Sequence, residues 1–282
     1  STYLAIRFAI ETLPPFLMAG ARFMIAGAVL YAWRRLRGDA APSRPEWRSA
    51  AMIGILLLLG GNGGVVYAQQ WVPSGLAALL VTTVPLWMVL MDLLHPSGRR
   101  PGRPAVAGVA MGFAGVALLI GPAQVAGQAA HVDLVGAAVL MLASLSWAIG
   151  SLYHRGARLP SSPLLAVGME MLAGGAGLLI LGMLTGELSH LNLAAVTARS
   201  FWSWAYLVVF GSWVGFAAYV WLLRAAPTPL VSTYAYVNPL VAVLLGHFFA
   251  GESVTSRVAA ATAVIVGSVA LTTWKPAESS RD

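Results

Sequence analysis

Apolar runs recur along the whole chain, and each is about long enough to cross a lipid bilayer as a helix. About 20 apolar residues are needed to span the roughly 30 Å hydrocarbon core. The runs predict an all-α polytopic membrane protein with ten transmembrane helices, the first of them truncated because Ser1 already lies inside an apolar run. The predicted spans are residues 1–10, 16–34, 49–71, 74–94, 104–121, 132–153, 162–185, 201–223, 228–250 and 257–274.

The few charged residues indicate how these helices are oriented. Hydrophobic residues make up 59% of the chain and charged residues 10%, whereas soluble domains carry about 25% charged residues. The net charge is +7, and most arginines lie in the loops after the even-numbered spans. Basic loops stay in the cytoplasm, so we expect both termini there and a location in the bacterial cytoplasmic (inner) membrane. Because this loop bias accounts for the charge, the expected partner is the lipid bilayer and no nucleic acid.

The sequence contains a weak internal repeat. Residues 19–23 match residues 167–171, and residues 83–86 match residues 237–240 in the same order. Each half would hold five helices, an odd number, so the second copy enters the membrane from the opposite side, as in many secondary transporters. Chance similarity among Leu-, Ala- and Gly-rich helices is the alternative. The predicted units are residues 1–121 (helices 1–5) and residues 132–274 (helices 6–10).

Several short motifs resemble one family of membrane proteins. They are Ser1-Thr2-Tyr3-Leu4-Ala5-Ile6-Arg7, Val72-Pro73-Ser74-Gly75-Leu76-Ala77-Ala78 and Ser232-Thr233-Tyr234-Ala235-Tyr236-Val237-Asn238-Pro239. They resemble the drug/metabolite transporter superfamily, in its EamA branch, over nearly the whole chain. The resemblance implies ten helices in two EamA repeats, a central cavity, and export of amino acids or other metabolites. Cavity residues contributed by the start of helix 1 lie beyond this sequence.

Paired prolines point to a binding site near the middle of the membrane. Pro85 in helix 4 and Pro239 in helix 9 occupy matching repeat positions, and proline kinks a helix by removing a backbone hydrogen bond. Interrupted helices at equivalent positions are typical of transporter binding sites. Polar and aromatic residues gather near them and beside the Gly-rich stretches of helices 3 and 8. The predicted substrate-binding residues are Asn62, Tyr67, Gln69, Gln70, Thr82, Thr83, Trp87, Ser212, Trp213, Tyr219, Tyr234, Tyr236 and Asn238.

Ionisable residues inside membrane spans are candidates for coupling or gating. Arg22 in helix 2 and Glu170 in helix 7 occupy equivalent repeat positions with opposite charge, and each is costly to place in lipid. We expect them to face the cavity or to bias its two openings. The alternative is a structural pair, or two groups bonded to nearby backbone. Glu170 is also a candidate for proton coupling. His247 in helix 9 is either a packing histidine or part of a proton relay.

Helices 5 and 10 carry small residues at helical spacing. Gly108 and Gly112 lie four residues apart, and so do Ala259, Ala263 and Gly267. Such spacing lets helix backbones approach closely. We expect packing faces here, with a contact in a homodimer as one use of them.

These features favour secondary export of a small organic metabolite, and of an amino acid in particular. An uncoupled channel or facilitator and an efflux carrier for cationic or aromatic drugs are the alternatives. An enzyme is disfavoured because the sequence lacks H-E-x-x-H, G-x-S-x-G and paired intramembrane aspartates. An ATP-driven pump is disfavoured because no phosphate-binding loop precedes Lys275. No cofactor and no metal site are expected.

Overall fold

The computed structural model describes residues 1–94, 102–120, 133–225 and 234–273, and every regular element in this part of the chain is a helix. Each of the ten predicted spans contains helix, which confirms the predicted all-α fold. Six helical spans of the described residues are long and apolar enough to cross a membrane. They are Pro15–Leu36, Arg44–Ala68, Ser74–Met91, Leu134–Gly156, Pro163–Leu184 and Ala198–Ala225. Three shorter apolar helices are Pro104–Leu119, Val237–Ala250 and Ser256–Leu271.

Several spans are divided into consecutive helical segments. In chain order, the first half contains α1 (Thr2–Ala9), α2 (Pro15–Leu36), α3 (Arg44–Gly54), η1 (Ile55–Gly63), α4 (Gly64–Ala68), α5 (Ser74–Val81), α6 (Val84–Leu94) and α7 (Arg103–Ile120). The second half contains α9 (Leu134–Gly156), α10 (Pro163–Leu184), α11 (Glu187–His190), η2 (Leu193–Ala195), α12 (Ala198–Tyr206), η3 (Leu207–Phe216), α13 (Ala217–Ala225), α15 (Tyr234–Ala250) and α16 (Ser256–Thr273).

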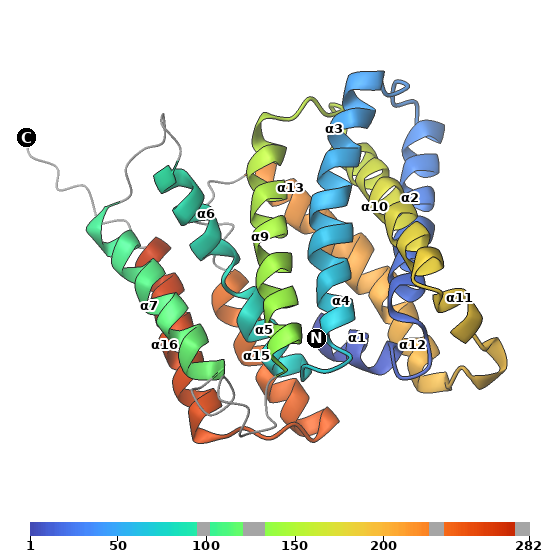
Figure 1. The fold of residues 1–282 in the computed structure, drawn as a ribbon. Coiled ribbons are helices and arrows are strands. Elements are labelled where there is room, and N and C mark those ends of the chain that lie inside the picture. The colour runs from blue at the N-terminus through green and yellow to red at the C-terminus, as the bar shows by residue number, and fades with distance from the viewer. Residues whose placement is uncertain (95–101, 121–132, 226–233, 274–282) are drawn as a thin grey trace, which may run out of the picture.

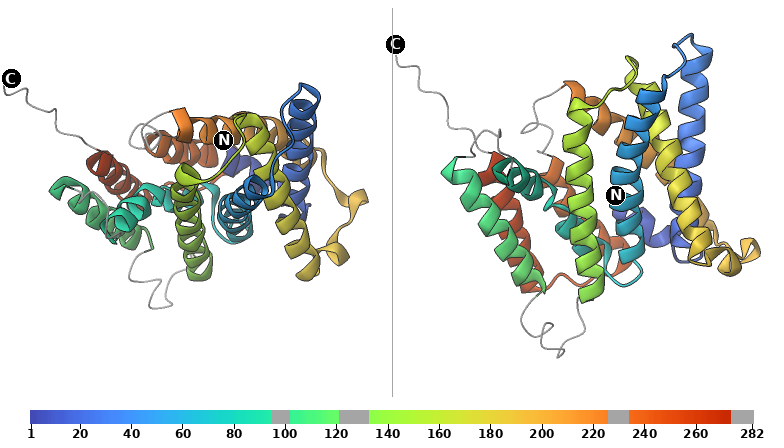
Figure 2. Two further views of the ribbon diagram at one scale, coloured as in Figure 1. Left: turned by 90° about the horizontal axis from the view of Figure 1, so that it is seen from above. Right: turned by 45° about the horizontal axis from the view of Figure 1, so that its top comes forward.

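Helices that are equivalent in the two repeats pack side by side. The helices α2 and α10 run along each other at one end of the molecule, and α7 and α16 do the same at the other end (Figure 1). The view from above shows α9 and the α3–η1–α4 helix between these two pairs (Figure 2). Pairing of equivalent helices in this way is expected when two inverted repeats meet around a pseudo-two-fold axis.

Glycines let the backbones of α2 and α10 come close. A Cβ atom at Gly27 would lie 2.9 Å from the carbonyl oxygen of Gly168, and one at Gly175 would lie 2.9 Å from the amide nitrogen of Met24. Gly20 and Gly27 correspond to Gly168 and Gly175 at one constant sequence offset. The repeat therefore contributes the same small residues to both sides of this contact, and close approach is the reason for them.

The loops that follow α2 and α10 share the same local structure. Gly38 has φ 96° and precedes Asp39, and Gly186 has φ 79° and precedes Glu187. A positive φ favours glycine because a Cβ atom would clash with the backbone. The Glu187 carboxylate accepts hydrogen bonds from the backbone N–H groups of Phe16 (3.1 Å) and Leu17 (2.9 Å) at the start of α2. Each repeat thus places a carboxylate near the first turn of the equivalent helix in the other repeat, and the Glu187 carboxylate satisfies two unpaired backbone donors there.

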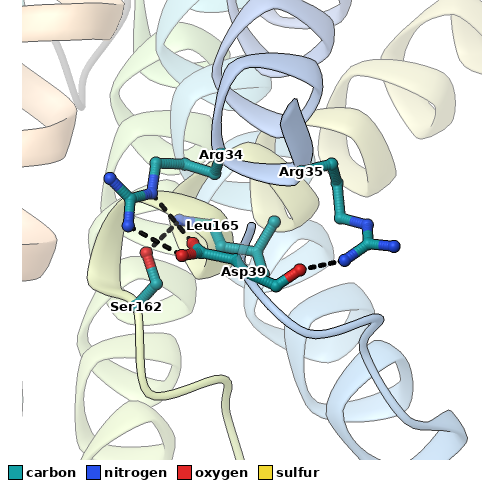
Figure 3. A network of polar contacts seen from close by, with 5 residues as sticks. All are labelled: Arg34, Arg35, Asp39, Ser162 and Leu165. Atoms are coloured by element: carbon teal, nitrogen blue, oxygen red, sulfur yellow. Dashed lines mark hydrogen bonds and ion pairs between the residues drawn. The ribbon is translucent and has the colours of Figure 1, made fainter. Parts of the chain in front are cut away.

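Asp39 is the counterpart of Glu187 and lies beside Ser162, the N-cap residue of α10 (Figure 3). Its carboxylate accepts two hydrogen bonds from Arg34, from Nε and Nη2, both at 2.8 Å. Arg35 donates to the backbone carbonyl of Asp39. The Arg34 guanidinium, followed by the Ser162 hydroxyl, lowers the pKa of Asp39 below its ordinary value. These contacts join the first repeat to the second on the face that carries the basic loops.

The Gly-rich stretches of helices 3 and 8 are helical and not turns. Both η1 and η3 are π-helices, and they occupy equivalent places in the two repeats. A π-helix is rare and is found often at functional sites, because its wider turn changes which side chains share a face. The glycines serve to admit neighbours, since a Cβ at Gly61 would lie 2.7 Å from the Trp147 ring.

Helices 5 and 10, which are α7 and α16, pack on each other within the chain. Gly108 and Gly112 are buried, and a Cβ at Gly112 would meet Leu86 and lie 2.8 Å from Ser268 Oγ. The predicted packing role of the α7 glycines is confirmed. The buried face of α16 is a different one from the predicted stripe: Ala261, Ile265, Ser268 and Val269 are buried, whereas Ala259 and Ala263 are exposed. A homodimer through these helices stays a prediction.

Candidate functional site

A cavity of about 340 Å³ lies between the two halves of the chain. Ligand sites for small molecules begin at about 300 Å³, so this space suits a small solute. It is lined by Thr2, Tyr3, Ile6, Arg22, Phe23, Leu58, Asn62, Val65, Val81, Trp147, Gly211, Gly215, Phe216, Ala218, Tyr219, Leu222 and Asn238. Both π-helices contribute to the lining, which links the unusual helical geometry to the site.

Arg22 is the charged side chain in the described lining of this cavity. Its side chain extends from α2 and is 2% exposed, and its Nη1 lies 3.9 Å from the position that a Cβ of Gly211 would take. The guanidinium carbon lies 4.1 Å from the centre of the Phe23 ring, which gives a cation–π contact. Its Nε and Nη1 atoms have no hydrogen-bond acceptor in the structure. A buried guanidinium without an acceptor is costly, so a ligand that supplies an acceptor would be stabilised here.

Other polar groups of the lining surround this charge. The Asn62 side-chain oxygen is buried and has no hydrogen-bond donor. The Tyr219 hydroxyl lies 2.7 Å from Ser151 Oγ. The Trp147 ring packs against the rings of Tyr219, at 5.5 Å between centroids, and of Phe216, at 6.3 Å. The cavity thus offers one cation, one free amide oxygen and a set of aromatic faces.

Three predicted substrate-binding residues lie in the lining together with Arg22. They are Asn62, Tyr219 and Asn238. The side chains of Tyr234 and Tyr236 lie outside the described residues. Arg22 does not pair with Glu170, because the Glu170 carboxylate contacts His154. The structural-pair alternative for Arg22 and Glu170 is therefore excluded.

The remaining predicted polar residues are held in contacts outside this lining. Gln69 is fully buried and donates through Nε2 to the Tyr3 carbonyl, and Gln70 donates to the Tyr67 carbonyl. The Thr82 and Thr83 hydroxyls donate to backbone carbonyls one turn earlier in the chain, and Ser212 does the same. Their roles in binding stay predictions.

The aromatic candidates also have packing partners. Tyr67 stacks on Phe16 with 5.3 Å between ring centroids. Trp87 packs edge-on against Phe113 at 5.1 Å, and its buried Nε1 has no hydrogen-bond acceptor. Trp213 donates through Nε1 to the Ala26 carbonyl at 3.1 Å. These contacts are enough to explain why each of these rings lies where it does.

The two prolines differ in their effect on the helices. The span that contains Pro85 is interrupted at Thr82 and Thr83, between α5 and α6. Pro239 lies inside α15, which continues through it. The expected interruption is thus present in the first repeat, whereas in the second repeat the helix absorbs the proline. His247 is exposed, and its Nδ1 lies 3.0 Å from the Glu252 carbonyl.

A second buried polar group lies outside the cavity lining. Glu170 is fully buried, His154 is 3% exposed, and Glu170 Oε1 lies 3.5 Å from His154 Nε2. Sequence reasoning missed His154 because the predicted helix 6 ended at residue 153, one residue before it. It also missed Tyr3, Phe23 and Trp147, because an aromatic side chain at a cavity has no sequence signal that separates it from one in the core. Among the described residues, no cluster of three or more His, Cys, Asp or Glu side chains is arranged to hold a metal ion.

The fold and the cavity together define a class of protein. Apolar helices in two repeats, with a cavity at their seam that contains a few polar groups, are the architecture of a membrane transporter. The chain belongs to the EamA-like transporter family, whose pattern matches residues 1–121 and 134–274. This confirms the resemblance seen in the sequence, the two repeats and the expectation that the chain is not an enzyme.

Relatives of the chain carry the same general description. The chain is 40% identical over 275 residues to the uncharacterized inner membrane transporter YedA of Escherichia coli (strain K12), covering 97% of this chain and 86% of that protein. It is 26% identical over 264 residues to the uncharacterized transporter YvbV of Bacillus subtilis (strain 168), covering 93% and 83%. A crystal structure with 24% identity superimposes with a TM-score of 0.66 over 96% of this chain and 94% of that one, which shows a shared fold. The chain is an inner-membrane transporter of this family.

Proposed function

We propose that this chain exports small organic metabolites, and amino acids in particular, across the bacterial cytoplasmic membrane. The observation that carries the proposal is Arg22, a buried guanidinium with donors that lack an acceptor at the edge of the cavity. A guanidinium binds a carboxylate through two parallel hydrogen bonds. An amino acid would place its carboxylate on Arg22 and its side chain against the aromatic faces.

The size and charge of the cavity favour this solute over the alternatives. A volume of about 340 Å³ suits a molecule the size of one amino acid. A cationic drug would meet Arg22 as a like charge at short range, which opposes binding. An aromatic compound that carries a carboxylate fits the same chemistry, and belongs to the same proposal.

The mechanism proposed is alternating access. The two repeats would rock about their seam and open the cavity first to one side of the membrane and then to the other. The basic loops would face the cytoplasm, together with both termini. The break between α5 and α6 next to Pro85 is a place where such a motion could bend the chain.

Substrate counterflow in proteoliposomes tests this function. Vesicles loaded with an excess of one unlabelled amino acid are diluted into the same labelled amino acid, and each of the twenty amino acids is tried. We expect transient accumulation of label for a subset of them. Linear, unstimulated uptake would indicate a channel instead, and no uptake of any amino acid would contradict the proposed substrate class.

Replacement of Arg22 identifies the binding group in the same assay. We expect Arg22→Gln to weaken amino-acid binding by about 1.5–3 kcal/mol, the range for a hydrogen bond to a charged group. Arg22→Lys should recover part of it, because the charge remains while the two-point geometry is lost. Arg199→Gln is the control, because Arg199 is an exposed arginine that pairs with Glu11 away from the cavity. Wild-type counterflow in Arg22→Gln would exclude Arg22 from binding.

A further inference from the structure

The buried carboxylate of Glu170 and the imidazole of His154 face each other in the interior of the protein. Their closest approach is 3.5 Å, between Oε1 and Nε2. Neither oxygen of Glu170 and neither ring nitrogen of His154 makes a hydrogen bond in the structure. Both side chains are at least 97% buried, by their exposures of 0% and 3%. The four polar atoms of this pair can therefore offset the free-energy cost of their burial only through each other or through a bound proton.

A pair of this kind has to hold a proton to be stable in an apolar surrounding. A lone buried carboxylate is expensive, and it becomes acceptable when it is protonated or faces a cation. With one proton shared between them, the pair is either an acid beside a neutral imidazole or a carboxylate beside an imidazolium. Gain or loss of a second proton changes the charge of the site by one unit. The site can thus store a proton and respond strongly to it.

The groups around the pair are few. His154 comes from α9, and Arg224 of α13 is near enough to act on Glu170 electrostatically. Arg224 is held by a 3.1 Å hydrogen bond from Nη1 to the Pro160 carbonyl. Three further elements, α2, α3 and η1, pack on α10. A Cβ at Gly168 would lie 2.9 Å from the backbone nitrogen of Tyr31, and one at Gly54 would meet the backbone carbonyl of Glu170. Of the ionisable side chains on these elements, His154 contacts the Glu170 carboxylate, and Tyr31 packs in the apolar cluster that contains Leu165 and Met169 of α10.

The repeat gives this pair a definite relation to the cavity. Glu170 occupies in the second repeat the position that Arg22 occupies in the first, at the offset that also relates Gly20 to Gly168 and Gly38 to Gly186. Arg22 lines the cavity, whereas Glu170 is enclosed. When inverted repeats exchange their conformations during transport, equivalent positions exchange their surroundings. The alternate state would then enclose Arg22 and open Glu170 to the cavity.

A polar path also leads from the cavity toward the pair. Tyr219 lines the cavity, and its hydroxyl lies 2.7 Å from Ser151 Oγ. Ser151 and His154 are three residues apart on α9, so they lie on one face of that helix, one turn from each other. Hydroxyl groups in such a row can pass a proton when the site opens.

We propose that His154 and Glu170 form the proton-binding site of this transporter, and that the site takes up a proton from one side of the membrane and releases it to the other as the repeats exchange conformations. The inference rests on the proposed export function and adds its driving ion. One proton enters the pair in one state and leaves in the other, in exchange for solute leaving the cell. No other co-reactant is needed.

Infrared spectroscopy of the protein in lipid tests proton binding without any substrate. The difference spectrum between acidic and alkaline buffer should contain a carboxylic-acid C=O band that Glu170→Gln lacks. His154→Gln should shift the midpoint of this band. His190→Gln is the control, because His190 is exposed at the end of α11, and the spectrum of this variant should match that of the unaltered protein. An identical carboxylic-acid band in Glu170→Gln would overturn the assignment.

Transport driven by a pH gradient tests the coupling. Proteoliposomes that contain a pH-sensitive dye and an amino acid active in counterflow should acidify as the solute leaves, and a pH gradient should accelerate efflux. We expect loss of both responses in Glu170→Gln, with thermal unfolding and gel filtration used to show that the protein is folded. If Glu170→Gln does not fold, Ser151→Ala serves as the second variant and should slow proton uptake.

The two proposals fail in different ways. Absence of counterflow in the unaltered protein contradicts the export function. Counterflow without any proton movement, or with proton movement unchanged in Glu170→Gln, contradicts the proton site alone.

Discussion

At the scale of single residues, the buried charged groups of the membrane-spanning helices differ in what they face. Glu170 faces the His154 imidazole at 3.5 Å, although neither carboxylate oxygen makes a hydrogen bond. Arg22 is equally buried, has donors without an acceptor, and lines the cavity. In lipid an unsatisfied charge is expensive and is retained for function. The missing partner of Arg22 is therefore the clearest indication that a solute binds beside it.

Asp39 supports a prediction about pH that concerns stability. Hydrogen bonds from Arg34 and Ser162 lower the pKa of Asp39. The ionised carboxylate therefore contributes fully to the free energy of unfolding above the ordinary aspartate pKa of about 3.9. This contribution is lost as the pH falls through the lower pKa that Asp39 has in the folded protein. We expect Asp39→Asn to lower the unfolding temperature slightly at neutral pH, since the pair is partly exposed. The difference should begin to shrink as the pH falls toward about 4 and should vanish once the pH is below the lowered folded pKa of Asp39. A difference that is constant across the pH range, measured by thermal unfolding in detergent, would contradict this.

At the scale of helices, the contact between α2 and α10 depends on glycine. A Cβ at Gly27 would lie 2.8 Å from Met171 Cβ and 2.9 Å from the Gly168 carbonyl oxygen. These neighbours belong to the backbone and to the base of a side chain, so they cannot move away without shifting a helix. The same close approach recurs at Gly175. The α2–α10 contact is thus a close backbone contact that joins the two repeats.

Gly27→Ala tests the close approach. We expect it to destabilise the protein by about 1–3 kcal/mol, the range for overpacking in a core. Gly156→Ala is the matched control, because a Cβ at Gly156 would meet nothing within 4 Å. Thermal unfolding of both variants in one detergent decides the matter, and equal stability of the two would show that α2 and α10 are free to separate.

The two prolines should differ when they are replaced. Pro85 follows the break between α5 and α6, whereas α15 continues through Pro239. We expect Pro85→Ala to slow counterflow by restoring a continuous helix, and Pro239→Ala to have a smaller effect, with folding of both checked by gel filtration. Equal counterflow rates in Pro85→Ala, Pro239→Ala and the unaltered protein would contradict the hypothesis that the chain bends at the break between α5 and α6.

Sequence reasoning predicted some of these elements and missed others for physical reasons. The spans and the repeat follow from hydropathy and matched positions such as Gly20 and Gly168, and these depend on local sequence alone. The π-helices η1 and η3 were not foreseen, because their wider turns depend on how neighbouring helices pack. His154 was missed because helix ends are predicted only to within a few residues. The predicted span ended at residue 153, so His154 was assigned to a loop, whereas it lies in α9 and is buried.

At the scale of the whole molecule, the repeat explains both sites. One symmetry relates α2 to α10, α7 to α16, η1 to η3 and Arg22 to Glu170. The two halves have the same scaffold but carry opposite charges at the equivalent positions of Arg22 and Glu170. A solute that carries a carboxylate would bind in the half that contributes Arg22, and a proton would bind in the half that contributes Glu170. The symmetry thus provides two states, and the opposite charges give each state its own ligand.

Cysteine labelling of the cavity tests the central claim of a carrier with a cationic binding site. The sequence contains no cysteine, so Asn62→Cys would give a single thiol in the cavity lining, and Ala143→Cys a buried control. The measurement is the rate at which membrane-impermeant anionic and cationic thiol reagents label Asn62→Cys from each side of a vesicle membrane. The account predicts labelling from both sides, faster with the anionic reagent because of Arg22. Labelling from neither side or from one side alone, or faster labelling by the cationic reagent, would contradict it.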